Sequence, residues 1–354
     1  MNQILVSEKI YMRPELKRKK RMYKIESDMK KMIFIAVIFL SFIYLPIQGQ
    51  EKKESPKGKA IIQVFGNFHS GFGESRNDRG FELDRSYLGY QYDLGNGLSI
   101  KAVMDIGQSN DVSDYQRIAY IKNAEITWKI GNFTLHGGMI TTTQYNLQDK
   151  FWGNRYIYRS FQDLYKFGSS ADLGISTSYE LADWISVDAI IVNGEGFKKV
   201  QRNDGLLYGA GTIITPIQGV TLRLYGSLNE SSEDSKEDIT NFSSFIGYKN
   251  ESFSIGAEYN MMQNYGNTKD QDLSGFSIYS NIKLQEKTQL FLRYDDISSK
   301  EDWNKTKDES ALLAGVQFKL GKYVKLAPNF RMNIPKADGV DNNYMAYINF
   351  SFGF

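Results

Sequence analysis

The segment that constrains the fold most is the last stretch of the chain, Tyr344 to Phe354. Every second residue along it is apolar, and these positions share one face: Tyr344, Ala346, Ile348, Phe350, Phe352 and Phe354. Because successive side chains of a strand point to opposite faces, this alternation predicts a β-strand. At the edge of a soluble sheet, the apolar face would lack cover and promote aggregation. The segment therefore predicts one strand of a barrel whose outer face meets lipid.

The same alternation repeats from residue 59 onward, in units of about ten residues, a tight turn, about ten more residues and a longer polar loop. In one such hairpin, the turn from Asp93 to Gly97 separates two alternating segments, and it contains an Asn-Gly pair. Asn-Gly is a strong hairpin signal. Counting these hairpins with an opening and a closing strand predicts an all-β fold, a transmembrane antiparallel β-barrel of about 16 strands, with about 14 to 18 allowed.

The front of the chain has the composition of an export signal. Residues 29–49 contain Lys30 and Lys31, an apolar run and a small residue near the expected cleavage point, which predicts a signal peptide. A retained membrane helix is the alternative, but about 16 apolar residues interrupted by Pro46 are short for a span. Residues 1–28 are then a dispensable extension or a wrongly assigned start. Residues 50–58 are expected to form a periplasmic linker, and residues 59–354 the barrel.

Composition argues against several other classes. A helical membrane protein needs several apolar runs of about 20 residues, whereas the chain has one shorter run, at its front. The absence of cysteine removes disulfides, thiolate chemistry and cysteine-bound metals. Residues 1–49 hold ten of the 43 Lys and Arg and four of the 41 Asp and Glu, which leaves 33 basic against 37 acidic residues. The chain beyond its leader is therefore acidic overall, and its charge gives no argument for a nucleic-acid partner.

The longest connection between predicted strands is residues 141–168. A loop of this length, in a barrel that must hold a channel, most economically folds inward and narrows it. It carries four cations interleaved with aromatic residues: Lys150, Arg155, Arg159 and Lys166. Such cations at a constriction would favour anions. The alternative, which we weight equally, is that they pack the loop against the wall through ion pairs and cation–π contacts.

The polar faces of the predicted strands add further candidates for the channel lining: Arg85, Lys101, Asp105, Arg223, Arg293 and Arg331. The polar faces carry both signs of charge, which predicts a wide and weakly selective lumen with internal ion pairs. A phosphate-specific pore would need a dense ladder of one sign. The alternation does not place the arginines at one depth, so phosphate specificity stays a hypothesis.

Two other function classes remain as alternatives. A barrel enzyme of the phospholipase or protease type needs a histidine beside a nucleophile or an acid. The only histidines are His69 and His136, which fall on lumen-facing positions of different predicted strands and lie in no nucleophile motif. A non-conducting structural barrel would need a plugged lumen, and only residues 141–168 are long enough to serve. We therefore expect no catalytic site, no cofactor and no metal.

Three stretches of the predicted barrel carry a family likeness: FELDRSYLGYQYDLGNGLSIKAVMDIG at 81–107, MITTTQYNLQDKFWGNRYIYRSFQDLYKFGSSADLGIS at 139–176 and VNGEGFKKVQRNDGLLYGAG at 192–211. They resemble the short Gram-negative outer-membrane porins related to phosphate-selective porins O and P. The first matches the family's arginine-bearing second strand, and the second matches its long loop before a SADLG strand. The resemblance covers residues 59–354. It implies a general or anion-preferring diffusion pore, often trimeric.

The expected partners follow from the fold and from this resemblance. The barrel would sit in outer-membrane lipid after export, and it would pass small hydrophilic solutes or inorganic anions. Its C-terminal aromatic residues would be the signal that the barrel assembly machinery recognises: Phe350, Phe352 and Phe354. A homotrimer is the assembly that the resemblance implies. No nucleic-acid partner is expected.

Overall fold

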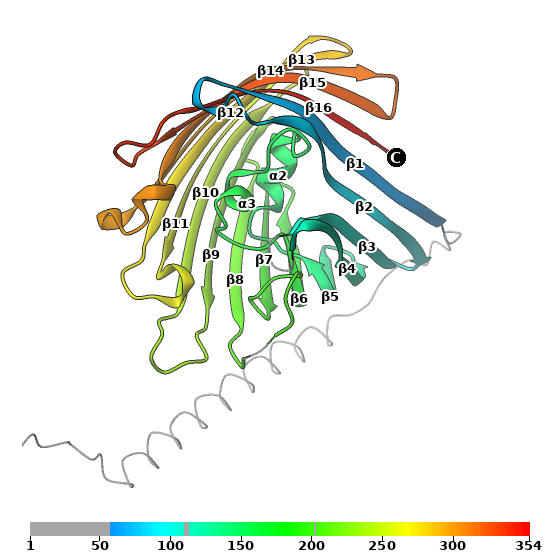
Figure 1. The fold of residues 1–354 in the computed structure, drawn as a ribbon. Coiled ribbons are helices and arrows are strands. Elements are labelled where there is room, and N and C mark those ends of the chain that lie inside the picture. The colour runs from blue at the N-terminus through cyan, green and yellow to red at the C-terminus, as the bar shows by residue number, and fades with distance from the viewer. Residues whose placement is uncertain (1–56, 110–112, 202) are drawn as a thin grey trace, which may run out of the picture. The chain divides into compact units, whose positions relative to one another are not determined.

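A computed structural model describes residues 57–109, 113–201 and 203–354, and within them sixteen strands close into one barrel (Figure 1). Each strand pairs antiparallel with its neighbours in sequence, and β1 pairs with β16 to close the sheet. The predicted fold class is confirmed. The strands are β1 (Lys57–Phe72), β2 (Arg79–Gly95), β3 (Leu98–Ser109), β4 (Ser113–Ile130), β5 (Phe133–Thr141), β6 (Ala171–Ala182), β7 (Ile185–Val192), β8 (Leu207–Ile214), β9 (Val220–Asn229), β10 (Ile239–Lys249), β11 (Phe253–Gln263), β12 (Leu273–Gln285), β13 (Thr288–Ser299), β14 (Glu309–Leu320), β15 (Val324–Pro335) and β16 (Asn343–Gly353).

The predicted extension 1–28 and signal peptide 29–49 lie outside the described residues, as do residues 50–56 of the predicted linker. The last two residues of that linker, Lys57 and Gly58, already belong to β1. The first strand therefore begins two residues earlier than the alternation indicated, because neither residue carries an apolar side chain that would reveal it.

Alternation along the strands separates an apolar outer face from a mixed inner face. On β14, the outward Leu312 is 43% exposed, whereas the next residue, Leu313, is 2% exposed and lies inside the barrel. On β16, Ile348 is exposed on the outside while Asn349 and Ser351 are buried on the inside. An apolar outer wall is what a barrel in lipid requires.

The two ends of the barrel differ in their connections. The turn between β2 and β3 is formed by Asn96 and Gly97, both with positive φ (53° and 75°), a conformation that Asn-Gly pairs adopt readily. Connections at the opposite end are longer, and the longest joins β5 to β6. Short turns at one end and long loops at the other are the usual arrangement of outer-membrane barrels.

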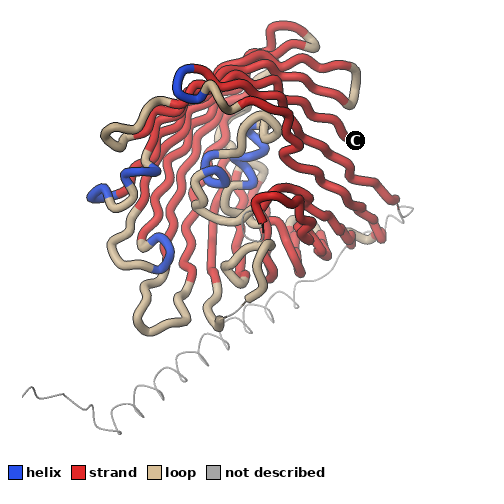
Figure 2. The backbone as a smooth tube through the Cα atoms, viewed as in Figure 1, coloured by secondary structure: helices blue, strands red, loops and turns tan. Residues whose placement is uncertain are grey.

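The long connection, residues 142–170, leaves the wall and folds into the barrel (Figures 1 and 2). We call it the constriction loop. It contains two short helices, α2 (Asn146–Trp152) and α3 (Phe161–Leu164). Its bounds differ slightly from the predicted 141–168 because β5 runs through Thr141 and β6 starts at Ala171. The main apolar cluster lies inside the barrel, between this loop and the wall.

The helices are few and short in the described part of the chain. None of them is long and apolar enough to cross a membrane. Over the same residues, no group of three or more His, Cys, Asp or Glu side chains is placed to hold a metal ion.

Candidate channel constriction

Aromatic packing fixes the constriction loop to the inner wall of the barrel. The Trp152 indole lies 5.4 Å from the Tyr279 ring and 6.4 Å from the Phe291 ring, centre to centre, and both contacts are close to edge-to-face. Phe151 meets Phe245 in the same manner at 5.1 Å. The three wall rings are buried and come from β12, β13 and β10. Because each such pair adds about 0.5–1.5 kcal/mol beyond simple burial, the loop is a packed element of the structure.

Three wall arginines hold the backbone of the loop in place. Arg223, Arg293 and Arg331 each donate a hydrogen bond of 2.6 to 2.7 Å to a loop carbonyl, at Thr143, Arg159 and Ile157 respectively. Arg223 and Arg293 are only 2% and 3% exposed. Arg331 also stacks over the Tyr347 ring, 3.7 Å from its centre. These three predicted lining residues therefore lie between the wall and the loop, and support the loop.

The two most buried arginines each have a carboxylate partner on the wall. Arg223 pairs with Asp188 on β7, and Arg293 pairs with Asp295 on its own strand, both at 2.7 Å. A buried cation without a partner would be costly, since removing one member of such a pair destabilises a protein by about 3–5 kcal/mol. The pairs let the wall present donors to the loop while remaining neutral.

The wall across the opening from the loop carries its own charge pairs. Arg85 on β2 lies 3.1 Å from Asp105 on β3, and Lys101 on β3 lies 2.7 Å from Glu125 on β4. Opposite charges on adjacent strands stabilise a sheet. The structure places these predicted lining residues on the inner face, where the charge of each cation is matched by a neighbour.

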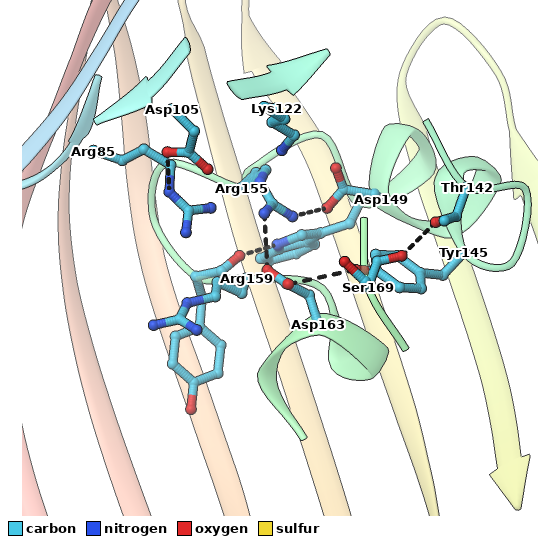
Figure 3. Close-up of polar contacts among 12 residues, drawn as sticks. Arg85, Asp105, Lys122, Thr142, Tyr145, Asp149, Arg155, Arg159, Asp163 and Ser169 are labelled. Carbon is cyan, nitrogen blue, oxygen red and sulfur yellow. Dashed lines mark hydrogen bonds and ion pairs between the residues drawn. The ribbon is translucent and has the colours of Figure 1, made fainter. Parts of the chain in front are cut away.

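The loop contains an ion network of its own (Figure 3). Arg155 lies 3.0 Å from Asp149 and 2.8 Å from Asp163. Tyr145 donates a longer hydrogen bond, 3.4 Å, to the Asp163 carboxylate. Burial alone would raise the pKa of Asp163, but the guanidinium groups of Arg155 and Arg159 lower it below its ordinary value of 3.8. Asp163 is therefore ionised at neutral pH, and both ion pairs of Arg155 lie within the loop.

Lys122 is the lining residue that the sequence pattern missed. Strict alternation counted back from the outward Ile126 places it on the outer face. A bulge in the pairing of β4 with β3, next to Asn123, shifts the register there. Ile121 consequently lies on the outside, 60% exposed, and Lys122 turns inward, where its Nζ donates to the Tyr87 hydroxyl at 3.1 Å. Neither glycine nor proline marks the bulge, and its signal in the sequence is the change of phase between the outward residues Ile121 and Ala124.

The other loop cations differ from Arg155. Lys150, Arg159 and Lys166 are exposed. Neither they nor Lys122 forms an ion pair with any residue in the described ranges. The constriction thus combines cations that form ion pairs with cations that form none.

Two adjoining cavities lie between the loop and the wall, one against β1, β15 and β16 and the other against β1 to β5. One, of about 330 Å³, extends toward Lys325 at the end with short turns. The other, of about 290 Å³, is bordered by Lys122 and by the base of the loop. Both touch Ile61, Gln63 and Arg155. The loop therefore narrows the lumen at Arg155 and leaves space on both sides of that residue.

The two histidines lie on the inner wall, on β1 and β5. His69 contacts the Asn67 side chain at 2.8 Å and Asp78 at 3.1 Å. His136 contacts the Thr127 hydroxyl at 2.9 Å. Among the contacts of the described residues, neither histidine joins a hydroxyl and a carboxylate into a hydrogen-bonded triad.

No family model matches the sequence, and no curated protein matches it. Solved structures of outer-membrane proteins do share its fold. OmpF of Salmonella typhi in complex with daunomycin is 11% identical, with a TM-score of 0.65, over 84% of this chain and 98% of that one. The anion-selective porin from Comamonas acidovorans is 12% identical, with a TM-score of 0.61, over 85% of this chain and all of that one. OmpT of Vibrio cholerae is 17% identical, with a TM-score of 0.60, over 86% of this chain and all of that one.

At these identities the likeness concerns the fold alone. The fold is that of the outer-membrane porins. The narrower resemblance to phosphate-selective porins O and P stays a prediction, since no family model supports it.

Proposed function

We propose that the protein is an outer-membrane porin, a water-filled channel for small hydrophilic solutes with a preference for anions. The observation that carries the proposal is the position of the constriction loop. Its side chains pack against the inner wall, and two adjoining cavities remain beside it, one against β1, β15 and β16 and the other along β1 to β5. A non-conducting structural barrel would instead need the loop to fill the lumen.

The balance of charge at the opening supports the preference for anions. Arg85, Lys101 and Arg155 are each paired with a carboxylate, so they contribute little net charge. Lys122 on the wall and Arg159 on the loop form no ion pair with the described residues, as is also true of the loop cations Lys150 and Lys166. An excess of positive charge in a low-dielectric channel lowers the barrier for anions. Because most arginines here are paired or bound to the loop backbone, we propose a weak and general preference, in which inorganic phosphate is one permeant anion among several.

The proposed location in the outer membrane follows from the outer surface of the barrel. Apolar side chains cover the outward positions of the strands, which suits outer-membrane lipid. The C-terminal aromatic residues Phe350, Phe352 and Phe354 belong to this outer face, and we propose that the barrel assembly machinery recognises them. A homotrimer is the proposed assembly, and one OmpT structure of Vibrio cholerae is described as a trimer form.

A barrel enzyme is the second candidate, and His136 is the residue that would carry it, because it contacts the Thr127 hydroxyl. An alanine at either His69 or His136 should leave conductance unchanged if the protein is a channel. Loss of a hydrolytic activity on that substitution would favour the enzyme.

The channel proposal is tested by reconstituting the folded barrel in a planar lipid bilayer. We expect stepwise conductance, and a reversal potential in a KCl gradient whose sign indicates chloride preference. Absence of conductance from correctly folded protein would overturn the proposal. Conductance with potassium preference would retain the channel and overturn its anion preference.

A further inference from the structure

The Lys122 ammonium group borders the cavity of about 290 Å³ and lies near two aromatic rings, of which Tyr87 borders the same cavity. Its Nζ is 4.6 Å from the centre of the Tyr87 ring and 5.6 Å from the centre of the Phe197 ring. Phe197 comes from the connection between β7 and β8, and it meets Tyr120 edge-on with ring centres 6.2 Å apart. Cation–π attraction of this kind holds the ammonium group in a defined place.

The ammonium group is not saturated by these contacts. It has three N–H donors, and one of them bonds to the Tyr87 hydroxyl at 3.1 Å. No carboxylate in the described part of the chain pairs with it. Lys101 and Arg155, which border the same cavity, are both paired. Lys122 is thus the cation on this cavity wall that has donors and charge to offer a ligand.

The size of the space suits a small organic molecule. The cavity is about 290 Å³, near the lower end of small-molecule pockets, which span about 300–1,000 Å³. Its lining combines the Lys122 charge with the Tyr87 ring and with the polar side chains of Asn123 and Thr141. The Asp149 carboxylate also borders the cavity, and it is paired with Arg155. An inorganic anion would use only the charge, whereas the rings offer contact to a molecule that carries an apolar or aromatic body.

We propose that Lys122, Tyr87 and Phe197 form a binding site for small carboxylates that bear an aromatic ring. The site rests on the proposed function, since it lies along the path of the channel. The carboxylate accepts hydrogen bonds from the free donors of Lys122. The ring of the ligand packs edge-to-face against Phe197 or Tyr87, a geometry that aromatic pairs prefer. The channel then favours aromatic acids over acids of equal charge without a ring.

The test compares sodium benzoate, sodium cyclohexanecarboxylate and sodium acetate by isothermal titration calorimetry on the full chain in detergent, at constant ionic strength. We expect benzoate to bind roughly fivefold more tightly than acetate, the factor that one aromatic contact supplies. Cyclohexanecarboxylate should fall between them. F197L keeps an apolar side chain but removes the ring, so its affinity for benzoate should be close to its affinity for cyclohexanecarboxylate.

Charge variants test the role of Lys122. K122Q should weaken the binding of benzoate and of acetate to the same extent. K122R should retain benzoate binding if the variant folds. The matched control is K287Q, because Lys287 is exposed in the turn between β12 and β13, and it should bind like the parent protein. Equal affinity for benzoate and acetate would overturn the site, as would unchanged benzoate affinity in folded K122Q.

Failure of this site and failure of the channel are distinguishable. A barrel that conducts chloride but binds the acids equally lacks the site and keeps the proposed function. A barrel that prefers benzoate in calorimetry but gives no bilayer conductance keeps the site and loses the channel.

Discussion

Replacing Lys122 with glutamate is expected to reverse the charge preference of the channel. The ion pairs around Arg155, taken together with Lys122 and Arg159, comprise five cations and four carboxylates: Arg85, Lys101, Lys122, Arg155 and Arg159, against Asp105, Glu125, Asp149 and Asp163. The parent constriction therefore has an excess of one positive charge. K122E changes this by two units and leaves an excess of one negative charge.

The size of the effect follows from Coulomb's law. An ion that passes about 5 Å from a unit charge in water gains or loses about 0.8 kcal/mol. This energy corresponds to roughly a fourfold change in the permeability of chloride and to the opposite fourfold change for potassium, so their ratio changes by roughly 16-fold. A two-unit change in charge should therefore alter each permeability by about fifteenfold, in opposite directions, and their ratio by roughly 200-fold. The estimate applies at 0.1 M salt or below, where the screening length is about 10 Å or more.

Reversal potentials of single channels in a KCl gradient measure this ratio directly. The potential should change sign in K122E. K287E is the control, because that residue lies outside the lumen, and its reversal potential should match the parent's. An unchanged potential in K122E would refute the argument that the unpaired lysine sets selectivity. Equal shifts in both variants would show that total charge, and not position, matters.

Three further predictions concern the loop and the last strand. R293Q should destabilise the folded barrel by about 3–5 kcal/mol in urea titrations, because it leaves Asp295 buried without its partner, whereas the double variant R293M/D295L should recover part of that loss. The pKa of Asp163 is lowered from 3.8, so its pairing with Arg155 stabilises the loop fully above that value and is lost as the pH falls through the folded pKa. The unfolding temperature should therefore be level from about pH 5 to 8 and should fall below pH 5, and this fall should be smaller in D163N. F354A should reduce the yield of assembled barrel on unheated gels, since this exposed ring lies on the outer face, and should leave the reversal potential unchanged; a changed potential would contradict this.

The fold could be predicted from the sequence because it depends on a local pattern of residues. Two-residue alternation assigns each strand position to one of two faces, as Leu312 and Leu313 illustrate. Turn residues such as Asn96 and Gly97 set where each hairpin reverses. An even number of strands with one apolar face then closes into a barrel.

The inward position of the long loop was also predictable, because its length exceeds what a surface connection needs. The sequence left open whether its cations pack the loop or stand free at the constriction, and the structure shows cations in both settings. Arg155 packs through ion pairs with Asp149 and Asp163, whereas Arg159 and Lys166 are exposed.

Lys122 and the wall arginines show where alternation is insufficient. Alternation places Arg223, Arg293 and Arg331 on the inner face, but it does not reveal which inner residues the loop covers. That depends on contacts between segments far apart in the chain, such as Arg331 and Ile157. One bulge beside Lys122 reverses the predicted face, because a shift of one residue in register exchanges inside for outside.

The C-terminal segment shows both what the sequence determines alone and what only the tertiary structure decides. By itself, the sequence determined that Phe350, Phe352 and Phe354 share one face, because the period of two is a property of any extended strand. Only the tertiary structure decided that Asn349, on the opposite face, donates from its amide to the loop carbonyl of Tyr156. The outward side chains of every strand meet the same lipid environment. The inward side chains contact whichever part of the chain the closed barrel brings against them.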